Sequence, residues 1–307
     1  MKVSVILPVH QPGEPLACLL DALAGQRPPV DELLVLETGH EPGVRSLVER
    51  VGGRHLAIGA DEYDHAGSRS AAVREASGDV VVLLSQDVCP ADEHGLARLV
   101  APLAGAGHVA ASFGRQLSEP DAHPLMEFKR RYLYPATDDE RGLDDRGRLG
   151  FRTVQMSNAF AAYRRDRLAE VGWFGERQLV CEDVSVAARL LRAGHRIRYV
   201  AGALVVHAHR SGFVDELRRY FDIGAAYQQD PVILDTFGRP RREGWRFVSC
   251  GVRWLAHTGR PAMIPQFLAL CAGKRLFFAL GRRSRWLPRG LSSRLSTFPQ
   301  WWRRTPP

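Results

Sequence analysis

The sequence lacks the cysteine patterns that mark a disulfide framework or a structural zinc site. Its five cysteines are scattered, odd in number and form no C-x-x-C pair, whereas such frameworks and sites need regular spacing. A reduced, cytoplasmic setting is therefore expected. We also expect no signal peptide, because the first apolar segment, residues 3–9, is short and contains Pro8.

Long apolar segments are scarce as well. The longest stretch, residues 262–273, contains Pro265 and Gln266 and is followed by Lys274 and Arg275. A helix that spans a bilayer needs about 20 predominantly apolar residues. We therefore predict that the chain does not cross a membrane.

Two glycine-rich phosphate-binding motifs are absent. The first apolar segment is not followed by G-x-G-x-x-G, and G-x-x-x-x-G-K-[ST] occurs nowhere in the chain. The glycines of these motifs let backbone N–H groups approach phosphates closely. Their absence argues against a Rossmann dehydrogenase and against a P-loop nucleotide hydrolase.

Positive charge, in contrast, is abundant. The net charge of +8 over 307 residues indicates nucleic acid, an anionic membrane surface or phosphorylated substrates as partners. Much of this charge lies in residues 239–307, interleaved with tryptophan and phenylalanine. That mixture predicts a membrane-surface contact, with base stacking or a helical cap with solvated arginines as alternatives. Only net charge supports nucleic acid, so we predict no nucleic-acid partner.

Strand and helix patterns alternate along the first two thirds of the chain. Short apolar, β-branched segments are followed by leucines at helical spacing, which predicts a mostly parallel sheet flanked by helices. The segment 80–84 is apolar throughout, as in a central strand covered on both faces. Residues 134–150 are polar and predict a mobile loop, whereas 197–200 and 204–206 predict two short strands. We expect an α/β domain over residues 1–212 and a helical extension over 213–307.

Polar residues follow the central strand where it ends. Ser85, Gln86 and Asp87 come directly after residues 80–84, and open α/β sheets bind ligands at the carboxyl ends of their strands. Upstream, His65, Ser68 and Arg69 cluster where a helix begins, which is a favourable place for an anionic group. The alternative for Asp87 is a turn former or helix cap.

Other carboxylates allow two interpretations. Glu37 follows the second predicted strand and either contacts a ribose or base edge or is an exposed turn residue. Glu182 and Asp183 begin a predicted helix, where acidic residues also favour the helix dipole. His207 ends a predicted strand and is either a ligand or a partly buried structural histidine.

Taken together, these segments resemble a family 2 glycosyltransferase of the GT-A fold, and most closely the bacterial rhamnosyltransferases that build surface polysaccharides from dTDP-L-rhamnose. The segments that carry the resemblance are Val5-Ile6-Leu7-Pro8-Val9, Glu37-Thr38-Gly39, Asp64-His65-Ala66-Gly67-Ser68-Arg69, Ser85-Gln86-Asp87, Ser157-Asn158, Glu182-Asp183, 219–224 and 280–296. Their order and spacing cover nearly the whole chain.

The resemblance implies an inverting glycosyltransferase in which Asp183 is the catalytic base and Glu182 positions it. The residues expected to bind the nucleotide sugar are Pro8, His10, Glu37, His65, Ser68, Arg69, Gln86, Asp87, Arg218 and Arg219. Ser157 and Asn158 are expected on the acceptor side. A divalent cation, Mg²⁺ or Mn²⁺, would neutralise the leaving diphosphate, with Asp87 as first-choice ligand and His207 as second.

The implied partners are dTDP-L-rhamnose and a glycan or polyprenyl-linked acceptor, and the implied location is cytoplasmic, peripheral on the inner face of the plasma membrane. The sequence departs from the family pattern: Glu37 replaces an aspartate, Ala66 a glycine and Ser70 an asparagine, and Ser85-x-Asp87 replaces D-x-D. These departures leave two alternatives, which are a transferase that uses another nucleotide sugar and a non-catalytic protein that binds nucleotide or glycan.

Overall fold

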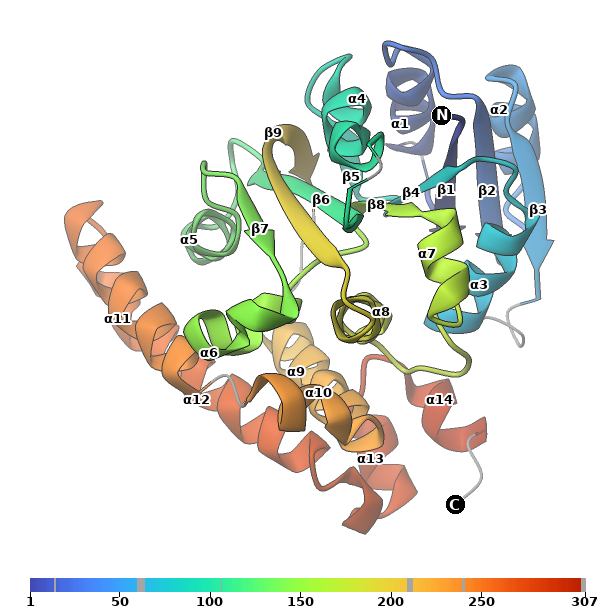
Figure 1. Cartoon of the computed structure of the whole chain (residues 1–307). Coiled ribbons are helices and arrows are strands. Elements are labelled where there is room, and N and C mark those ends of the chain that lie inside the picture. The colour runs from blue at the N-terminus through green and yellow to red at the C-terminus, as the bar shows by residue number, and fades with distance from the viewer. Residues whose placement is uncertain (14, 60–63, 106, 209–211, 239–240, 305–307) are drawn as a thin grey trace. The chain divides into compact units, whose positions relative to one another are not determined.

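The computed structural model describes residues 1–13, 15–59, 64–105, 107–208, 212–238 and 241–304 (Figure 1). The chain forms two compact units. The first comprises Met1–Gly147, Thr153–Arg177 and Glu182–His209, and the second comprises Arg148–Arg152, Gln178–Cys181 and Arg210–Pro307. The predicted domains 1–212 and 213–307 are not tested by this division and stay a prediction.

The first unit is built on one mixed sheet with helices on both faces (Figure 1). Its strands are β1 (Val3–His10), β2 (Glu32–Thr38), β3 (Arg54–Ile58), β4 (Val80–Leu84), β5 (Val88–Pro90), β6 (Val109–Ser118), β7 (Asp139–Arg141), β8 (Phe160–Arg164) and β9 (Arg196–His207). Its helices are α1 (Pro15–Ala24), α2 (Val44–Arg50), α3 (His65–Glu75), α4 (Gly95–Val100), α5 (Pro124–Leu133), α7 (Arg165–Glu170) and α8 (Glu182–Arg192), with 3₁₀ turns at Ala101–Leu103 and Leu143–Asp145.

The strand order is β3-β2-β1-β4-β8-β6-β9-β5, and β7 pairs with β9. Strands β1 to β4 are parallel, and β8 runs antiparallel between β4 and β6. The carboxyl ends of β1, β2 and β4 therefore lie at the same edge of the sheet as the amino end of β8. This edge collects the polar side chains that follow the parallel strands.

The core explains why residues 80–84 are apolar throughout. On one face, alternate residues of β1 and β4, such as Val5 and Val82, pack with Leu16 and Leu20 of α1 and with residues of α2 and α4. On the other face of the sheet, Ile6 of β1 and the alternate residues Val81 and Leu83 of β4 are also buried. Helix α3 contacts β1 and β2. A strand covered on both faces has no position for a polar side chain.

Two local predictions were wrong. Residues 134–150 are not a mobile loop, because β7 lies within them and pairs antiparallel with β9. Charged side chains fix this strand: Arg196 Nε lies 2.8 Å from Glu140 Oε1, and Arg141 Nε lies 2.8 Å from Asp139 Oδ2. The two short strands predicted at 197–200 and 204–206 are one strand, β9, which continues through Gly202.

The second unit is helical. Its elements are α9 (Phe213–Gln229), α10 (Pro231–Phe237), α11 (Arg241–His257), α12 (Ile264–Gly281), α13 (Arg289–Leu295) and α14 (Pro299–Arg304), with 3₁₀ turns at Pro261–Met263 and Ser284–Trp286. The short helix α6 (Arg146–Leu149) and the 3₁₀ turn Gly150–Val154 lie where the chain passes between the units. The predicted C-terminal helical extension is confirmed.

Helices α9 and α12 cross closely. A side chain at Gly224 would meet the carbonyl oxygen of Phe278, and one at Gly281 would meet the carbonyl oxygen of Phe221. Asp222 of α9 is fully buried and accepts hydrogen bonds from Ser296 Oγ at 2.6 Å and from the backbone N–H of residue 297 at 2.8 Å. The two late segments of the family resemblance thus contact each other and hold this unit together.

The apolar stretch 262–273 is part of a longer helical segment. Helix α12 continues through Lys274, whose Nζ lies 2.6 Å from Glu216 Oε2 and 4.8 Å from the centroid of the Tyr220 ring. Over Pro261–Gly281 the mean hydropathy is 1.3, so by length and composition alone this segment could span a bilayer, contrary to the expectation that the apolar stretch is too short. Among the described residues, this is the one helix that is long and apolar enough to do so.

Candidate functional site

The carboxyl ends of β1, β2 and β4 are tied together by side chains. Gln86, which follows β4, accepts a hydrogen bond from the backbone N–H of His10 at 2.7 Å and donates to the His10 carbonyl at 3.0 Å. The ring Nδ1 of His10 lies 3.0 Å from the carbonyl oxygen of Thr38, at the end of β2. Gln86 and His10 thus fix the sheet edge, whereas Pro8 lies within β1 and pairs with Leu36.

Asp87 meets His207 at the same edge. The two residues are 120 positions apart in sequence, yet Asp87 Oδ2 lies 2.9 Å from His207 Nε2. Strand pairing accounts for this approach, because Val88 of β5 is opposite His207 in β9. The His207 side chain is 10% exposed and that of Asp87 is 33% exposed, so the pair is accessible from the Asp87 side.

Glu37 is buried rather than exposed. Only 2% of the residue is accessible, so the interpretation as an exposed turn residue was wrong. Its Oε2 lies 2.7 Å from His55 Nε2, and its Oε1 accepts the backbone N–H of Glu41 at 2.5 Å. One carboxylate oxygen thus holds the β2–α2 connection and the other contacts β3, and the predicted nucleotide contact stays a prediction.

The amino end of α3 is capped by the side chain of its own N-cap residue, Asp64. The Asp64 carboxylate accepts the backbone N–H groups of Ala66 and Gly67 at 3.0 and 2.7 Å, and a side chain at Gly67 would collide with that carboxylate. Ser68 Oγ accepts the N–H of Asp64 at 3.3 Å. Because Asp64 already supplies a negative charge, the first turn of α3 is organised by the chain's own carboxylate.

Arg69 points from α3 toward α8. Its Nη1 donates to the carbonyl of His65 at 2.9 Å, and its Nε lies 3.4 Å from Glu182 Oε1. Both side chains of this pair are at least nine-tenths buried. Burial alone raises the pKa of Glu182, but the charges of Arg69 and His65 and a hydrogen bond from Asn158 outweigh it and lower that pKa. Glu182 is therefore an anion held in place.

Asn158 connects both acidic residues at the start of α8. Its Nδ2 donates to Glu182 Oε1 at 3.0 Å, and its backbone N–H donates to Asp183 Oδ2 at 3.3 Å. The other carboxylate oxygen of Asp183 accepts the N–H of Val184 at 2.8 Å. The neighbouring Ser157 Oγ accepts the N–H of Ala159 at 3.3 Å.

Tyr163 is a member of this cluster that the sequence analysis did not include. Its hydroxyl donates to Asn158 Oδ1 at 2.6 Å, and the residue is fully buried. Burial, together with the negative charges of Asp183 and Glu182, raises the Tyr163 pKa well above its ordinary value, so the hydroxyl stays a donor. The available signal was the tyrosine hydroxyl itself, because Tyr163 follows three apolar residues of β8 and a buried hydroxyl needs a hydrogen-bond partner.

The Asp87 and Asp183 segments meet at one sheet edge. The backbone N–H of Ser85 donates to the carbonyl of Ala159 at 3.3 Å, and Asn158, next to Ala159, contacts Asp183. The edge thus brings together the segments of Asp87, Asn158 and Asp183. Arg218 and Arg219 lie on α9 of the second unit, and their predicted role at phosphates stays a prediction.

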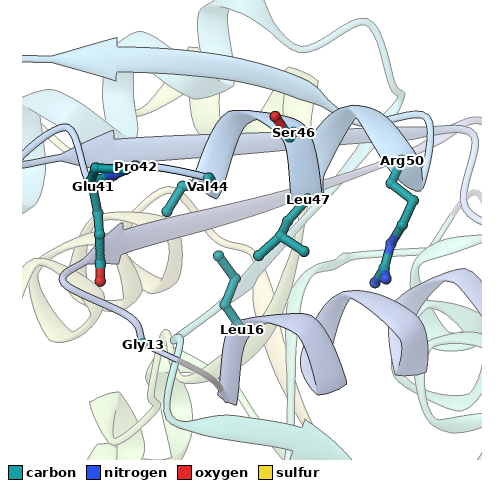
Figure 2. A pocket seen from close by; sticks show the side chains of 9 residues that line it. Gly13, Leu16, Glu41, Pro42, Val44, Ser46, Leu47 and Arg50 are labelled. Atoms are coloured by element: carbon teal, nitrogen blue, oxygen red, sulfur yellow. The ribbon is translucent and has the colours of Figure 1, made fainter.

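A pocket of about 670 Å³ lies beside Glu37, between the start of α1, the 41–43 turn and α2 (Figure 2). Leu16 and Leu47 face each other across it, and Glu41 and Arg50 stand at opposite ends (Figure 2). Its lining includes none of the predicted site residues. Among the described residues, groups of three or more His, Cys, Asp and Glu side chains arranged for a metal ion are absent, so Asp87 and His207 form a two-residue pair.

Known glycosyltransferases are similar to this chain in sequence. The family described as "Glycosyl transferase family 2" matches residues 4–171. The O-antigen chain rhamnosyltransferase RfbN of Salmonella typhimurium is 32% identical over 308 residues, covering 98% of this chain and 96% of the relative. WbaN of Salmonella anatum, also an O-antigen chain rhamnosyltransferase, is 33% identical over 272 residues, covering 88% and 86%.

Solved structures share the fold at low identity. A mannosyltransferase from Pyrobaculum calidifontis, in complex with GDP-Man and Mn²⁺, has a TM-score of 0.59 at 18% identity and covers 92% of this chain and 84% of its own. TarS 1-349 from S. aureus, in complex with UDP, has a TM-score of 0.56 at 16% identity, with 99% and 86% covered. The sheet edge, the family match and these relatives agree: the chain belongs to glycosyl transferase family 2 and is a glycosyltransferase of the GT-A fold.

Proposed function

We propose that this enzyme transfers L-rhamnose from dTDP-L-rhamnose, with inversion, to a glycan or polyprenyl-linked acceptor during synthesis of a bacterial surface polysaccharide. Two relatives named as O-antigen chain rhamnosyltransferases, each at least 32% identical over most of the chain, support the donor and the pathway class. The observation that carries the chemistry is the buried Asn158 bound to both Glu182 and Asp183.

Asp183 acts as the general base in this proposal. The acceptor hydroxyl gives its proton to an Asp183 carboxylate oxygen as its own oxygen bonds to the anomeric carbon. The bond from that carbon to the diphosphate oxygen breaks, and dTDP leaves. Asn158 aims the Asp183 carboxylate, and Glu182 keeps Asn158 and Arg69 in register. Positioning of this kind supplies much of the rate enhancement in transfer reactions.

Asp87 and His207 would hold the divalent cation. The residues fit the group, because a carboxylate oxygen and an imidazole nitrogen converge to 2.9 Å on an accessible edge. The carboxylate suits Mg²⁺ or Mn²⁺, and the imidazole favours the transition-metal ion, Mn²⁺. When bound, such an ion neutralises the charge that develops on the leaving diphosphate. One solved structure with a similar fold, a mannosyltransferase, contains GDP-Man and Mn²⁺. Arg218 and Arg219 are proposed to add charge at the phosphates.

A thermal-shift screen tests the donor. Purified protein with Mn²⁺ is heated with dTDP-L-rhamnose, dTDP-glucose, UDP-GlcNAc and GDP-mannose at equal concentrations. A ligand at 100 times its Kd stabilises the fold by about 2.7 kcal/mol, so dTDP-L-rhamnose is expected to give the largest shift. A larger shift with a UDP- or GDP-sugar refutes the proposed donor and leaves the family assignment intact.

We also propose that the second unit contacts an anionic membrane surface from the cytoplasmic side. Trp245 and Trp286 are 69% and 73% exposed, and the Arg285 guanidinium lies 4.8 Å from the Trp286 ring centroid. Exposed tryptophan beside arginine is typical of proteins that lie in the headgroup region. Helix α12 packs on α9 through Gly281 and the Lys274–Glu216 ion pair, which favours a helix on the surface over one that spans.

Vesicle sedimentation tests this contact. The double variant Trp245→Ser/Trp286→Ser is expected to bind vesicles of phosphatidylglycerol at least several-fold more weakly than wild type, with dTDP binding unchanged. Truncation after residue 288 is a poorer test, because it removes the Ser296 and Thr297 donors of Asp222. Equal sedimentation of wild type and double variant contradicts the proposed surface.

A further inference from the structure

His207 contacts two different groups through its two ring nitrogens. Its Nε2 lies 2.9 Å from Asp87 Oδ2, and its Nδ1 lies 2.8 Å from Gln116 Oε1. Gln116 reaches His207 from the neighbouring parallel strand, because Ser118 of β6 is opposite His207 of β9 and Gln116 is two residues earlier on the same face. Gln116 therefore stands behind the proposed cation ligand, on the side away from Asp87.

Arg130 identifies which atom of the Gln116 amide faces the histidine. A guanidinium group has N–H donors and no acceptor, and Arg130 Nη1 hydrogen-bonds to Gln116 Oε1. That atom must therefore be the carbonyl oxygen. The Gln116 Nε2 atom, in turn, is buried without a hydrogen-bond partner among the described residues. Since the same oxygen contacts His207 Nδ1, Nδ1 must carry the proton.

The position of that proton determines what His207 offers to Asp87. A neutral imidazole protonated on Nδ1 has its lone pair on Nε2, and this lone pair faces a carboxylate oxygen. Two acceptors in contact need a positive charge between them, which is either a second proton on Nε2 or a divalent cation in the place of that proton. Metal-bound histidines commonly donate their other ring N–H to a carbonyl or carboxylate, which fixes the tautomer and the ring orientation.

We propose that Gln116, held by Arg130, is a positioning residue that fixes His207 as an Nε2 ligand of the divalent cation. This inference rests on the proposed cation site of Asp87 and His207. Gln116 is 2% exposed and Arg130 is 9% exposed, so water does not readily replace the amide oxygen. Without that acceptor, the ring is free to rotate or to adopt the other tautomer.

Two nearly isosteric substitutions of Gln116 distinguish the loss of its hydrogen-bond acceptor from a change in side-chain volume. Gln116→Met removes the acceptor, whereas Gln116→Glu keeps an oxygen that accepts from both Arg130 and His207. Mn²⁺ binding is measured by electron paramagnetic resonance in the presence of dTDP. We expect Gln116→Met to bind Mn²⁺ about 10- to 100-fold more weakly than wild type and Gln116→Glu to remain within about threefold of it.

The outcomes distinguish this inference from the site on which it rests. If His207→Ala binds Mn²⁺ as wild type does, the proposed cation site itself is refuted. If His207→Ala weakens binding and Gln116→Met does not, the site stands and the role of Gln116 is refuted. Equal weakening by Gln116→Met and Gln116→Glu also refutes it, because the loss then follows any change at this position.

A spectroscopic measurement on the wild-type protein tests the tautomer without any risk of misfolding. Long-range ¹H–¹⁵N correlation spectra of the metal-free, ¹⁵N-histidine-labelled protein are recorded at alkaline pH, where imidazole is neutral, and His207 is assigned from the spectrum of His207→Ala. A protonated Nδ1 and an unprotonated Nε2 are expected. A spectrum of the Nε2–H tautomer overturns the inference.

Discussion

Replacing Tyr163 by phenylalanine removes one oxygen atom and leaves the buried ring in place. The ring packs edge-on against Phe174 with centroids 5.3 Å apart, and the hydroxyl makes a 2.6 Å hydrogen bond to Asn158 Oδ1. Losing a hydrogen bond of this kind costs about 1 kcal/mol, and a buried acceptor left without its donor costs about 1–3 kcal/mol. Because the variant no longer buries a hydroxyl, we expect a net loss near 1–2 kcal/mol in the free energy of unfolding.

The functional effect should exceed what this loss of stability explains. The side-chain amide of Asn158 donates to Glu182, and its backbone N–H donates to Asp183. A loosened Asn158 side chain therefore disturbs Glu182 directly and the proposed base through the Asn158 backbone, while the nucleotide side is unchanged. We expect kcat to fall about 10- to 100-fold, since small misplacements of catalytic groups have effects of this size, and the KM for the donor to change little. Urea unfolding gives the stability, and initial rates of sugar transfer give the kinetic constants.

Tyr199→Phe is the matched control. Tyr199 is also buried, and its hydroxyl donates to the carbonyl of Pro135 at 2.7 Å. This variant should lose similar stability and keep its kcat. Equal kcat values for Tyr163→Phe and wild type, or equal losses in both variants, would refute the reasoning that Tyr163 acts on the base through Asn158.

Three further predictions concern stability and the cation. Burial raises the pKa of Glu32, but hydrogen bonds from Ser4 and Ser77 favour its anion and outweigh burial, so that its pKa is about 2. A carboxylate whose pKa is lowered in the folded state stabilises the fold at pH values above its ordinary pKa of 4.5, and this stabilisation is lost as the pH falls toward 2. Glu32→Gln should therefore cost about 1–3 kcal/mol at pH 7, and urea midpoints should converge below pH 4.5; a pH-independent gap contradicts this. Gly281→Ala should lower the free energy of unfolding by about 1–3 kcal/mol, whereas Gly290→Ala, where an added Cβ has open space, should cost nothing. Chelator should abolish sugar transfer and Mn²⁺ should restore it; transfer that persists in excess chelator excludes the proposed role of Asp87.

The sheet was predictable because its strands carry strong local signals. Residues 80–84 are apolar and β-branched throughout, and the structure places them in the centre of the sheet with no exposed residue. Strand β7 has no such signal, since Asp139, Glu140 and Arg141 are all charged. Its place depends on ion pairs with arginines of β9, about 56 residues away, and no local pattern encodes a partner at that distance.

The candidate site was predictable in its residue types but not in its connections. Asp87, Glu182 and Asp183 belong to recognisable motifs, whereas Gln116 and Tyr163 lie inside strands without a motif of their own. What gives them a role is the residue that each contacts: His207 on the neighbouring strand for Gln116, and Asn158 just before β8 for Tyr163. Sequence alone also placed Arg69 at phosphates, and the structure pairs it with Glu182.

The central claim is that Asp183, aimed by Asn158, takes the proton of the acceptor hydroxyl. The most direct test is the initial rate of rhamnose transfer by Asp183→Asn, with dTDP affinity measured on the same preparation. Removing a general base should lower kcat about 10²- to 10⁴-fold and leave the Kd for dTDP unchanged. Transfer at the wild-type rate by the folded, dTDP-binding variant would contradict the claim.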